Sequence, residues 1–154
     1  MDPLTAKDIF TISCAVIGAV LGVINTWNGL NQRRVKLKVV PKMAYPVSHA
    51  GDFGPEMGCI EVTNLSAFPV TVGDIGFTID GDPRKKRRAA ILKPVVQDGG
   101  PWPRRLEARA SVSLYFDWGH LKRDIRKAYV LTDCGEVAYG NSPALKSMRK
   151  KLSA

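Results

Sequence analysis

The most constraining feature of the chain is an apolar stretch near its N-terminus, from Ile9 to Leu30. Between Ile9 and Ile24 it has no charge, and its only polar side chains there are Thr11, Ser13 and Cys14. At about 1.5 Å per residue, a helix of this length is roughly 33 Å long, close to the hydrocarbon thickness of a bilayer. The stretch predicts a single membrane-spanning helix. A buried helix of a soluble fold and a signal sequence are the alternatives.

The residues expected to make up the span are large and apolar. They are Ile9, Phe10, Val16, Ile17, Val20, Leu21, Val23 and Ile24. Gly18 and Gly22 lie four positions apart, on one side of the helix. Small residues at this spacing let two helices approach closely in lipid. The pair therefore predicts that the helix associates with a second copy, giving a homodimer.

Positive charge follows the apolar stretch directly, at Arg33, Arg34, Lys36 and Lys38, whereas Lys7 alone precedes it. Lys and Arg next to a span are retained on the cytoplasmic side. We therefore expect a single-pass protein of the inner (cytoplasmic) membrane, with its N-terminus outside and the rest of the chain in the cytoplasm. The same placement argues against a signal peptide, in which the positive charge comes before the apolar segment.

The rest of the chain alternates apolar and polar residues in short runs separated by turn residues, which predicts a mainly β fold. The expected strands are 35–40, 59–65, 70–79, 110–116, 129–132 and 136–139, with a weaker one at 91–96. In the second of them, Ile60, Val62 and Asn64 share one face. Gly73 and Gly76 predict a bulge or bend in the third. Together these strands predict an antiparallel β-sandwich.

Two short helices are also expected. One follows Asp117, because Leu121, Ile125 and Ala128 recur at helical spacing, and the other lies in the basic C-terminal segment. The expected organisation is therefore a tail and membrane anchor over residues 1–32, a sandwich domain over 33–142, and a basic tail or short helix over 143–154.

Two motifs make the chain resemble a known group: IEVTNLSAFPVTVGDIGF, which follows the apolar helix and VKLKV, and the later YVLTDCGEVAYG. The first is carried by Ile60, Val62, Asn64, Pro69, Val70, Thr71, Val72, Gly76 and Phe77, and the second by Val130, Asp133, Gly135 and Tyr139. In these motifs the chain resembles small, uncharacterised bacterial proteins with an N-terminal membrane helix and an immunoglobulin-like β-sandwich. The resemblance implies a fold and no particular activity.

Residues that could support catalysis or metal binding are sparse. His49 with Asp52, and His120 with Asp124, are two separate pairs, and neither has a third ligand nearby in the sequence. The chain has no Gly-rich phosphate loop and no serine nucleophile elbow. We therefore expect no enzyme, no metal and no cofactor. Cys59 and Cys134 are expected to be free thiols in a reducing cytoplasm.

The strongest local charge signal is the run of Arg84, Lys85, Lys86, Arg87 and Arg88. A run of five cations attracts anionic lipid headgroups, an acidic protein or nucleic-acid phosphates. A simple solvated loop is the alternative. On a domain tethered at the membrane, the anionic inner leaflet is the partner at highest effective concentration. Nucleic acid is less expected, because the run contains no aromatic residue for base stacking.

These observations predict a membrane-anchored, non-enzymatic interaction or scaffold module with a basic cytoplasmic domain. Its expected contacts are anionic lipid or an acidic protein partner. The alternative is a nucleic-acid-binding protein tethered at the membrane. Competition between anionic vesicles and oligonucleotides would separate the two.

Overall fold

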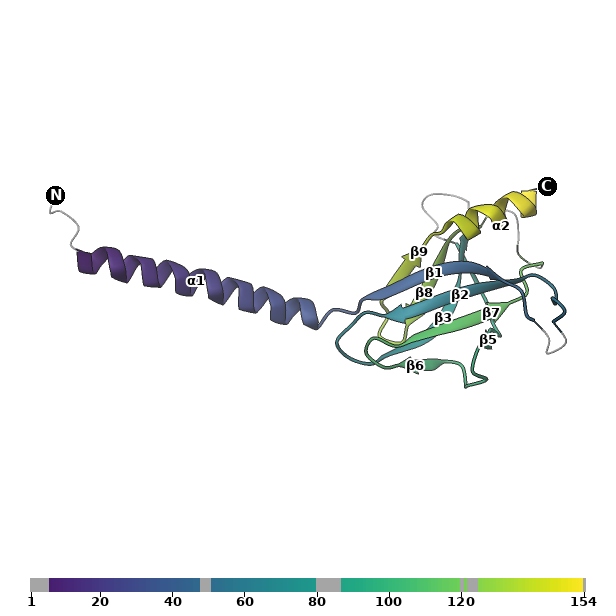
Figure 1. Ribbon diagram of the computed structural model, residues 1–154, viewed down its shortest axis with the longest axis horizontal. Coiled ribbons are helices and arrows are strands. Elements are labelled where there is room, and N and C mark those ends of the chain that lie inside the picture. Colours follow the sequence, from purple (N-terminus) through teal and green to yellow (C-terminus); the bar gives the residue numbers. More distant parts are fainter. Residues whose placement is uncertain (1–5, 48–50, 80–86, 120, 122–124, 154) are drawn as a thin grey trace. The chain divides into compact units, whose positions relative to one another are not determined.

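The computed structural model describes residues 6–47, 51–79, 87–119, 121 and 125–153, and the chain divides into two compact units, 1–34 and 35–154. The first unit consists of helix α1, Ala6–Gln32 (Figure 1). Within the candidate span Lys7–Gln32, the most apolar 18-residue window of this helix has a mean hydropathy of 2.0, and none of that window is buried. By length and composition, α1 can cross a membrane, as the sequence predicts.

Polar side chains within α1 bond to the helix itself. The Thr11 hydroxyl donates to the Lys7 carbonyl at 2.9 Å, and the Ser13 hydroxyl donates to the Ile9 carbonyl at 2.8 Å. Thr26 bonds to the Gly22 carbonyl in the same way, at 2.9 Å. Since lipid offers no partner for a hydroxyl, these bonds make the few polar groups compatible with an apolar surrounding.

The second unit consists mainly of two antiparallel sheets (Figure 1). The first has the order β1 (Leu37–Ala44), β2 (Met57–Asn64), β7 (Ser111–Phe116) and β5 (Val95–Val96). The second has the order β4 (Arg88–Ala90), β3 (Val70–Ile79), β8 (Ile125–Thr132) and β9 (Val137–Gly140), and β6 (Arg104–Leu106) also pairs with β3. The mainly β, antiparallel prediction is confirmed.

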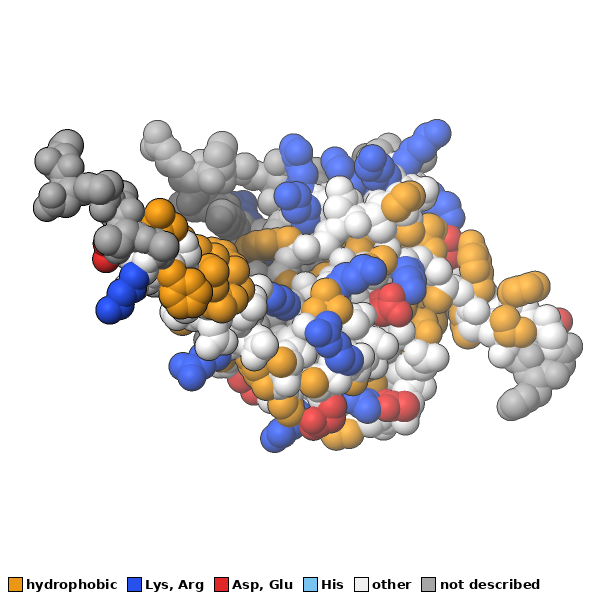
Figure 2. All heavy atoms as spheres, turned by 60° about the vertical axis from the view of Figure 1, so that its left-hand side comes forward, with side chains coloured by type: hydrophobic (Ala, Val, Ile, Leu, Met, Phe, Trp, Pro, Cys, Tyr) orange, Lys and Arg blue, Asp and Glu red, His pale blue; other side chains and the backbone are white. Residues whose placement is uncertain are grey.

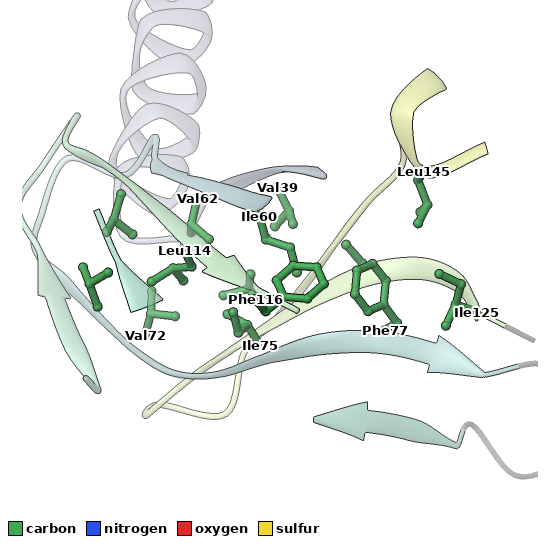
Figure 3. Close-up of a cluster of buried hydrophobic side chains, with 14 of the residues drawn as sticks. Val39, Ile60, Val62, Val72, Ile75, Phe77, Leu114, Phe116, Ile125 and Leu145 are labelled. Atoms are coloured by element: carbon green, nitrogen blue, oxygen red, sulfur yellow. The ribbon is translucent and has the colours of Figure 1, made fainter. Parts of the chain in front are cut away.

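One hydrophobic core lies between the two sheets (Figure 3). Phe77 of β3 and Phe116 of β7 meet across it edge to face, with ring centroids 5.5 Å apart. Ile60, Val62 and Asn64 are all fully buried, so their predicted common face is confirmed. The inward positions of both sheets therefore bury the apolar half of the alternating pattern.

Helix α2, Pro143–Ser153, packs against the same core. The Ser142 hydroxyl accepts a hydrogen bond from the Leu145 amide at 3.1 Å, which caps the helix ahead of Pro143 at its first position. Leu145 and Met148 are fully buried. The predicted C-terminal helix is confirmed, and it belongs to the core of the second unit.

The predicted helix after Asp117 is wrong where it covers Ile125 and Ala128, because both residues lie in strand β8. Ile125 pairs with Ile79 and Ala128 pairs with Phe77, so three steps on β8 match two steps on β3. A β-bulge thus adds one residue between two inward positions, and the resulting spacing of three imitates a helix.

Other strand boundaries also differ from expectation. β1 continues through Pro41, which an edge strand tolerates because its missing N–H is not needed there. Of the weaker strand expected over 91–96, only Val95–Val96 is a strand, β5, while β4 precedes that stretch at Arg88–Ala90. β6 lies in a segment that the pattern did not mark. The predicted irregularity at Gly73 is confirmed by a register shift between Val72 and Asp74.

Strand directions define two ends of the second unit. Leu37 pairs with Asn64, and β3 starts shortly after it at Val70, so these three residues lie at one end, the entry end. Ile79, the last residue of β3, pairs with Ile125 at the opposite end, the far end. β3 has ten residues, so at about 3.3 Å per residue the two ends are roughly 30 Å apart.

Candidate interaction surface

The described part of the predicted basic run, Arg87 and Arg88, lies at the far end. Arg84, Lys85 and Lys86 fall outside the described residues. Arg87 is exposed, and its carbonyl accepts a hydrogen bond from the Ile79 amide at 3.0 Å. Because Ile79 is the last residue of β3, this bond places Arg87 at the end of the sheets opposite Leu37.

Arg88 extends over the outer face of the second sheet. Its guanidinium lies 5.2 Å from the centre of the Tyr129 ring and donates a hydrogen bond to the Tyr139 hydroxyl at 3.2 Å. Gly76 of β3 lets the backbone of β4 approach closely, because a Cβ at that position would lie 2.0 Å from the Ala89 carbonyl oxygen. Arg88 is thus both an exposed cation and part of the fold.

Tyr129 is only 1% exposed although it lies on the outer face. Its hydroxyl donates to Asp74 Oδ2 at 2.8 Å. Burial raises the pKa of Tyr129 well above its usual value, and the Asp74 carboxylate raises that pKa further, while Arg88 opposes both. Tyr129 therefore remains a neutral hydrogen-bond donor at physiological pH.

Helix α2 adds cations to the same region. Lys146, Arg149 and Lys150 are exposed, on the side of the helix away from the buried Leu145 and Met148. Arg126 and Lys127 of β8 are also exposed, next to the β-bulge. Figure 2 shows Lys and Arg side chains along the upper margin of the domain, the margin on which Figure 1 places α2.

We call this region the cationic surface. It comprises Arg87, Arg88, Arg126, Lys127, Lys146, Arg149 and Lys150. The elements that carry it are β4, β8 and α2, and none of the three contains Asp or Glu. These elements therefore contribute positive charge alone, while the neighbouring carboxylates of Asp74 and Glu56 come from β3 and from the segment before β2.

Glu56 fixes the last turn of α2 to the far end. Its carboxylate accepts hydrogen bonds from Lys151 Nζ at 2.6 and 2.8 Å and from the Tyr45 hydroxyl at 2.8 Å. The Glu56 carbonyl accepts from Trp118 Nε1 at 3.0 Å, and Lys151 lies 5.7 Å from the centre of the Trp118 ring. Lys151 lowers the pKa of Glu56, while Glu56 raises the pKa of Lys151. Because Lys151 is paired with Glu56, it is not counted in the cationic surface.

Two hollows lie near the cationic surface and the first sheet. One, of about 330 Å³, opens between the sheets at the far end and is lined by Ile79, Ala89, Ala90, Ile91, Phe116, Asp117, Leu121 and Ile125. The other, of about 250 Å³, lies on the outer face of the first sheet and is lined by Ala44, Tyr45, Pro46, Met57, Val95 and Tyr115. Both linings are largely apolar.

The predicted helix-association residues lie on the open surface of α1. A Cβ added at Gly18 or Gly22 would meet nothing within 4 Å. Beside Gly22 is a hollow of about 410 Å³, lined by Ala19, Gly22, Val23, Thr26, Trp27 and Leu30. The side of the helix with small residues is therefore accessible to another helix.

Of the residues considered for catalysis or metal binding, only Asp52 and the cysteines are described. His49 and His120 lie outside the described residues, as does Asp124. Within the part of the chain that the structure describes, no group of three or more His, Cys, Asp or Glu side chains is placed to hold a metal ion. The three cysteines are free, with Cys59 buried and Cys134 exposed. Burial raises the pKa of the Cys59 thiol.

Sequence reasoning missed the two tyrosines of this surface. Tyr139 lies 51 residues after Arg88 in the chain, and only strand pairing brings the two side chains together. A sequence signal was present, because the predicted strands 129–132 and 136–139 begin and end, respectively, with a tyrosine. These two residues, Tyr129 and Tyr139, pair across β8 and β9. The hairpin could be predicted from its turn, but its position beside the basic run could not.

No protein-family model matches the chain, and no curated protein is significantly similar to it.

Proposed function

We propose that this protein is a membrane-anchored, non-enzymatic interaction module that presents a cationic surface to an acidic protein partner. In this proposal α1 spans the inner membrane once, with its N-terminus outside and the second unit in the cytoplasm. The length and apolar composition of α1 support the span, and the Arg33–Arg34 pair directly after it supports the orientation. The accessible Gly18 and Gly22 support a homodimer.

The second unit is proposed to be an immunoglobulin-like sandwich. In such folds one sheet has the strand order A-B-E-D and the other G-F-C, with C′ added beside C in the variable type. Counting strands along this chain, β1-β2-β7-β5 matches the first order and β9-β8-β3-β4 matches the second. β6 is an addition at the edge of β3. A fold of this kind hosts many binding functions and does not indicate an activity.

The observation that carries the proposed function is the accumulation of cations at the far end. Some Lys and Arg elsewhere in the second unit pair with carboxylates, as in Lys42–Glu61, Arg104–Asp98 and Arg105–Glu107. On the cationic surface, Lys127, Lys146 and Lys150 are exposed on elements without any acid. An acidic partner is the complement that such a surface steers and selects.

The position of this surface favours a protein partner over lipid. Arg87 lies roughly 30 Å from the entry end, where the chain continues to α1. This is nearly four Debye lengths of about 8 Å at physiological ionic strength, so headgroup charge near the entry end would attract these residues little. An acidic protein can reach this surface in any orientation of the second unit, and it is therefore the partner proposed.

Single-stranded nucleic acid is the second candidate. Tyr139 is 43% exposed and lies beside Arg88. An exposed aromatic ring among cations is the arrangement on which bases stack. The cationic surface therefore lies beside an exposed aromatic ring, which the basic run itself lacks.

The test uses the full chain in nanodiscs of zwitterionic lipid, with a labelled decaglutamate peptide and a labelled oligodeoxythymidine as probes. The surface variant is Lys146→Glu with Lys150→Glu. The matched control is Lys38→Glu with Lys93→Glu, two exposed lysines outside the cationic surface, so both variants have the same net charge. Fluorescence anisotropy reports binding of each probe.

The proposal expects the peptide to bind, and to lose at least about tenfold in affinity in the surface variant but not in the control. Preferential binding of the oligonucleotide, lost in the surface variant and weakened by Tyr139→Ala, would establish the second candidate instead. Equal loss in both variants would mean that net charge alone attracts the probe. Absence of binding by the unaltered chain would overturn the proposed function.

A further inference from the structure

We propose that the entry end of the second unit is itself a lipid-binding surface. Leu65 and Ala67, in the connection between β2 and β3, would enter the headgroup region of the bilayer, surrounded by cations. The inference rests on the proposed function in one respect, namely that α1 spans the membrane. It concerns the end of the second unit opposite the cationic surface.

Backbone hydrogen bonds attach this connection to the residues that follow α1. The Leu65 amide donates to the Lys36 carbonyl at 2.7 Å, and the Lys36 amide donates to Ser66 Oγ at 2.8 Å. Ser66 is 2% exposed, so the attachment is buried. Leu65 therefore stays next to Lys36 wherever the second unit moves.

Chain length then limits how far the connection lies from α1. Helix α1 ends at Gln32, four residues before Lys36. Four residues extend over at most about 14 Å, whatever the orientation of the second unit. A 27-residue helix is about 40 Å long and a hydrocarbon core about 30 Å, so a spanning α1 ends within or close to the headgroup layer. Leu65 is thus confined to the neighbourhood of that layer.

The connection is held rigidly by Asn64, which is fully buried. Its side-chain amide donates to the carbonyls of Phe68 at 2.8 Å and of Leu106 and Glu107, both at 3.1 Å. Its side-chain oxygen accepts from the Ser66 amide at 2.9 Å. Since these bonds order the connection in advance, lipid contact costs little further conformational entropy.

The side chains that remain outside have the composition of an interfacial contact. Leu65 is 38% exposed, and Ala67 and Ala108 are exposed beside it. Exposed cations at the same end are Lys36 and Arg109, whose amide donates to the Asn64 carbonyl at 3.0 Å. An apolar tip flanked by Lys and Arg binds anionic lipid through both burial and charge.

The acidic residues Glu107, Asp133 and Glu136 at this end are either paired with a cation or lie in another turn. Glu107 pairs with Arg105 at 3.3 Å. Asp133 and Glu136 are exposed in the β8–β9 turn, on the second sheet. The surface proposed for lipid is therefore the side formed by the β2–β3 connection, Lys36, Ala108 and Arg109.

The test places an environment-sensitive nitrobenzoxadiazole (NBD) label at single positions of the full chain in anionic liposomes. Cys14 and Cys134 are replaced by Ser, and the buried Cys59 is left in place. The label is attached at Leu65→Cys, with Leu92→Cys as the matched control, because Leu92 is an exposed leucine away from the entry end. Ile17→Cys reports the span, and spin-labelled lipids act as quenchers.

The expected result is quenching by headgroup-level spin labels and blue-shifted emission at position 65, with neither at position 92. If position 17 is quenched while positions 65 and 92 are quenched equally, or neither of them is quenched, the lipid contact is overturned and the span stays intact. No quenching at position 17 would refute the span. In that case quenching at position 65 alone would show that the entry end binds lipid without it, and no quenching at either position would reject both.

Discussion

The Arg88 guanidinium lies 5.2 Å above the centre of the Tyr129 ring, on the outer face of the second sheet. The contact joins an edge strand of three residues, β4, to the central strand β8, across β3. It explains why a tyrosine pointing away from the core is almost completely buried. Arg88 is thus both an exposed cation of the far end and the side chain that covers the Tyr129 ring.

Replacing this cover should weaken the fold measurably. We expect Arg88→Ala to lower the free energy of unfolding by about 1 kcal/mol, through loss of the cation–π contact and of the hydrogen bond to Tyr139. Urea unfolding in detergent micelles, followed by tryptophan fluorescence, would measure it. Lys150→Ala removes an exposed cation without such a contact and serves as control. Equal stability of the two variants would contradict the assigned role.

Alkaline pH should destabilise the second unit through Tyr129. The pKa of its phenol is raised in the folded protein, while the unfolded chain titrates near 10, so above pH 10 the folded state binds more protons. The contribution of Tyr129 to the free energy of unfolding is therefore fully present below pH 10. It falls as pH rises further, by up to about 1.4 kcal/mol per pH unit. Urea unfolding between pH 8 and 11 would show a smaller decline in Tyr129→Phe. The same decline in that variant would exclude Tyr129 as the source.

Helix α2 should behave as part of the core. Leu145 is fully buried, so Leu145→Ala should cost about 2–4 kcal/mol of unfolding free energy. Its neighbour Lys146 is exposed, and Lys146→Ala should change stability by less than about 0.5 kcal/mol. Thermal unfolding of both variants would measure the contrast. A neutral Leu145→Ala would mean that α2 docks weakly.

The orientation of the chain can be read from a native thiol. Cys134 is exposed at the entry end, whereas Cys59 is buried and Cys14 lies within α1. In the proposed orientation the second unit is in the cytoplasm. A membrane-impermeant maleimide should then leave Cys134 unmodified in intact cells and modify it after permeabilisation. Cys134→Ser identifies the labelled site. Labelling of intact cells would place the second unit outside.

Association of α1 should depend on its small residues. Gly18→Leu with Gly22→Leu would fill the accessible side of the helix, so a homodimer signal in a membrane two-hybrid reporter should be lost. Val16→Leu with Val20→Leu changes apolar bulk at two other exposed positions and should retain the signal. An unchanged signal in the glycine variant would assign the dimer to another surface.

Local patterning was sufficient for much of the fold. The uninterrupted apolar run predicts α1, because its length and composition matter more than any neighbour. Strict alternation predicts β2, since every second residue from Ile60 to Asn64 faces the core. Gly135 adopts a φ of 88°, which is why it marks the turn between β8 and β9. In each case the cause lies within a few neighbouring residues.

Tertiary structure decided what depends on pairing between distant segments. The β-bulge at Arg126 and Lys127 turns a helical spacing into a strand, and only the partner β3 reveals it. Arg88 meets Tyr139 across 51 residues, and Lys36 bonds to Ser66 across 30. Because strand register is set by burial of whole faces, such contacts have no signature in either segment alone. That is why the sequence predicted a basic run, while the packed sheets place its described residues, Arg87 and Arg88, opposite the end at which the chain enters.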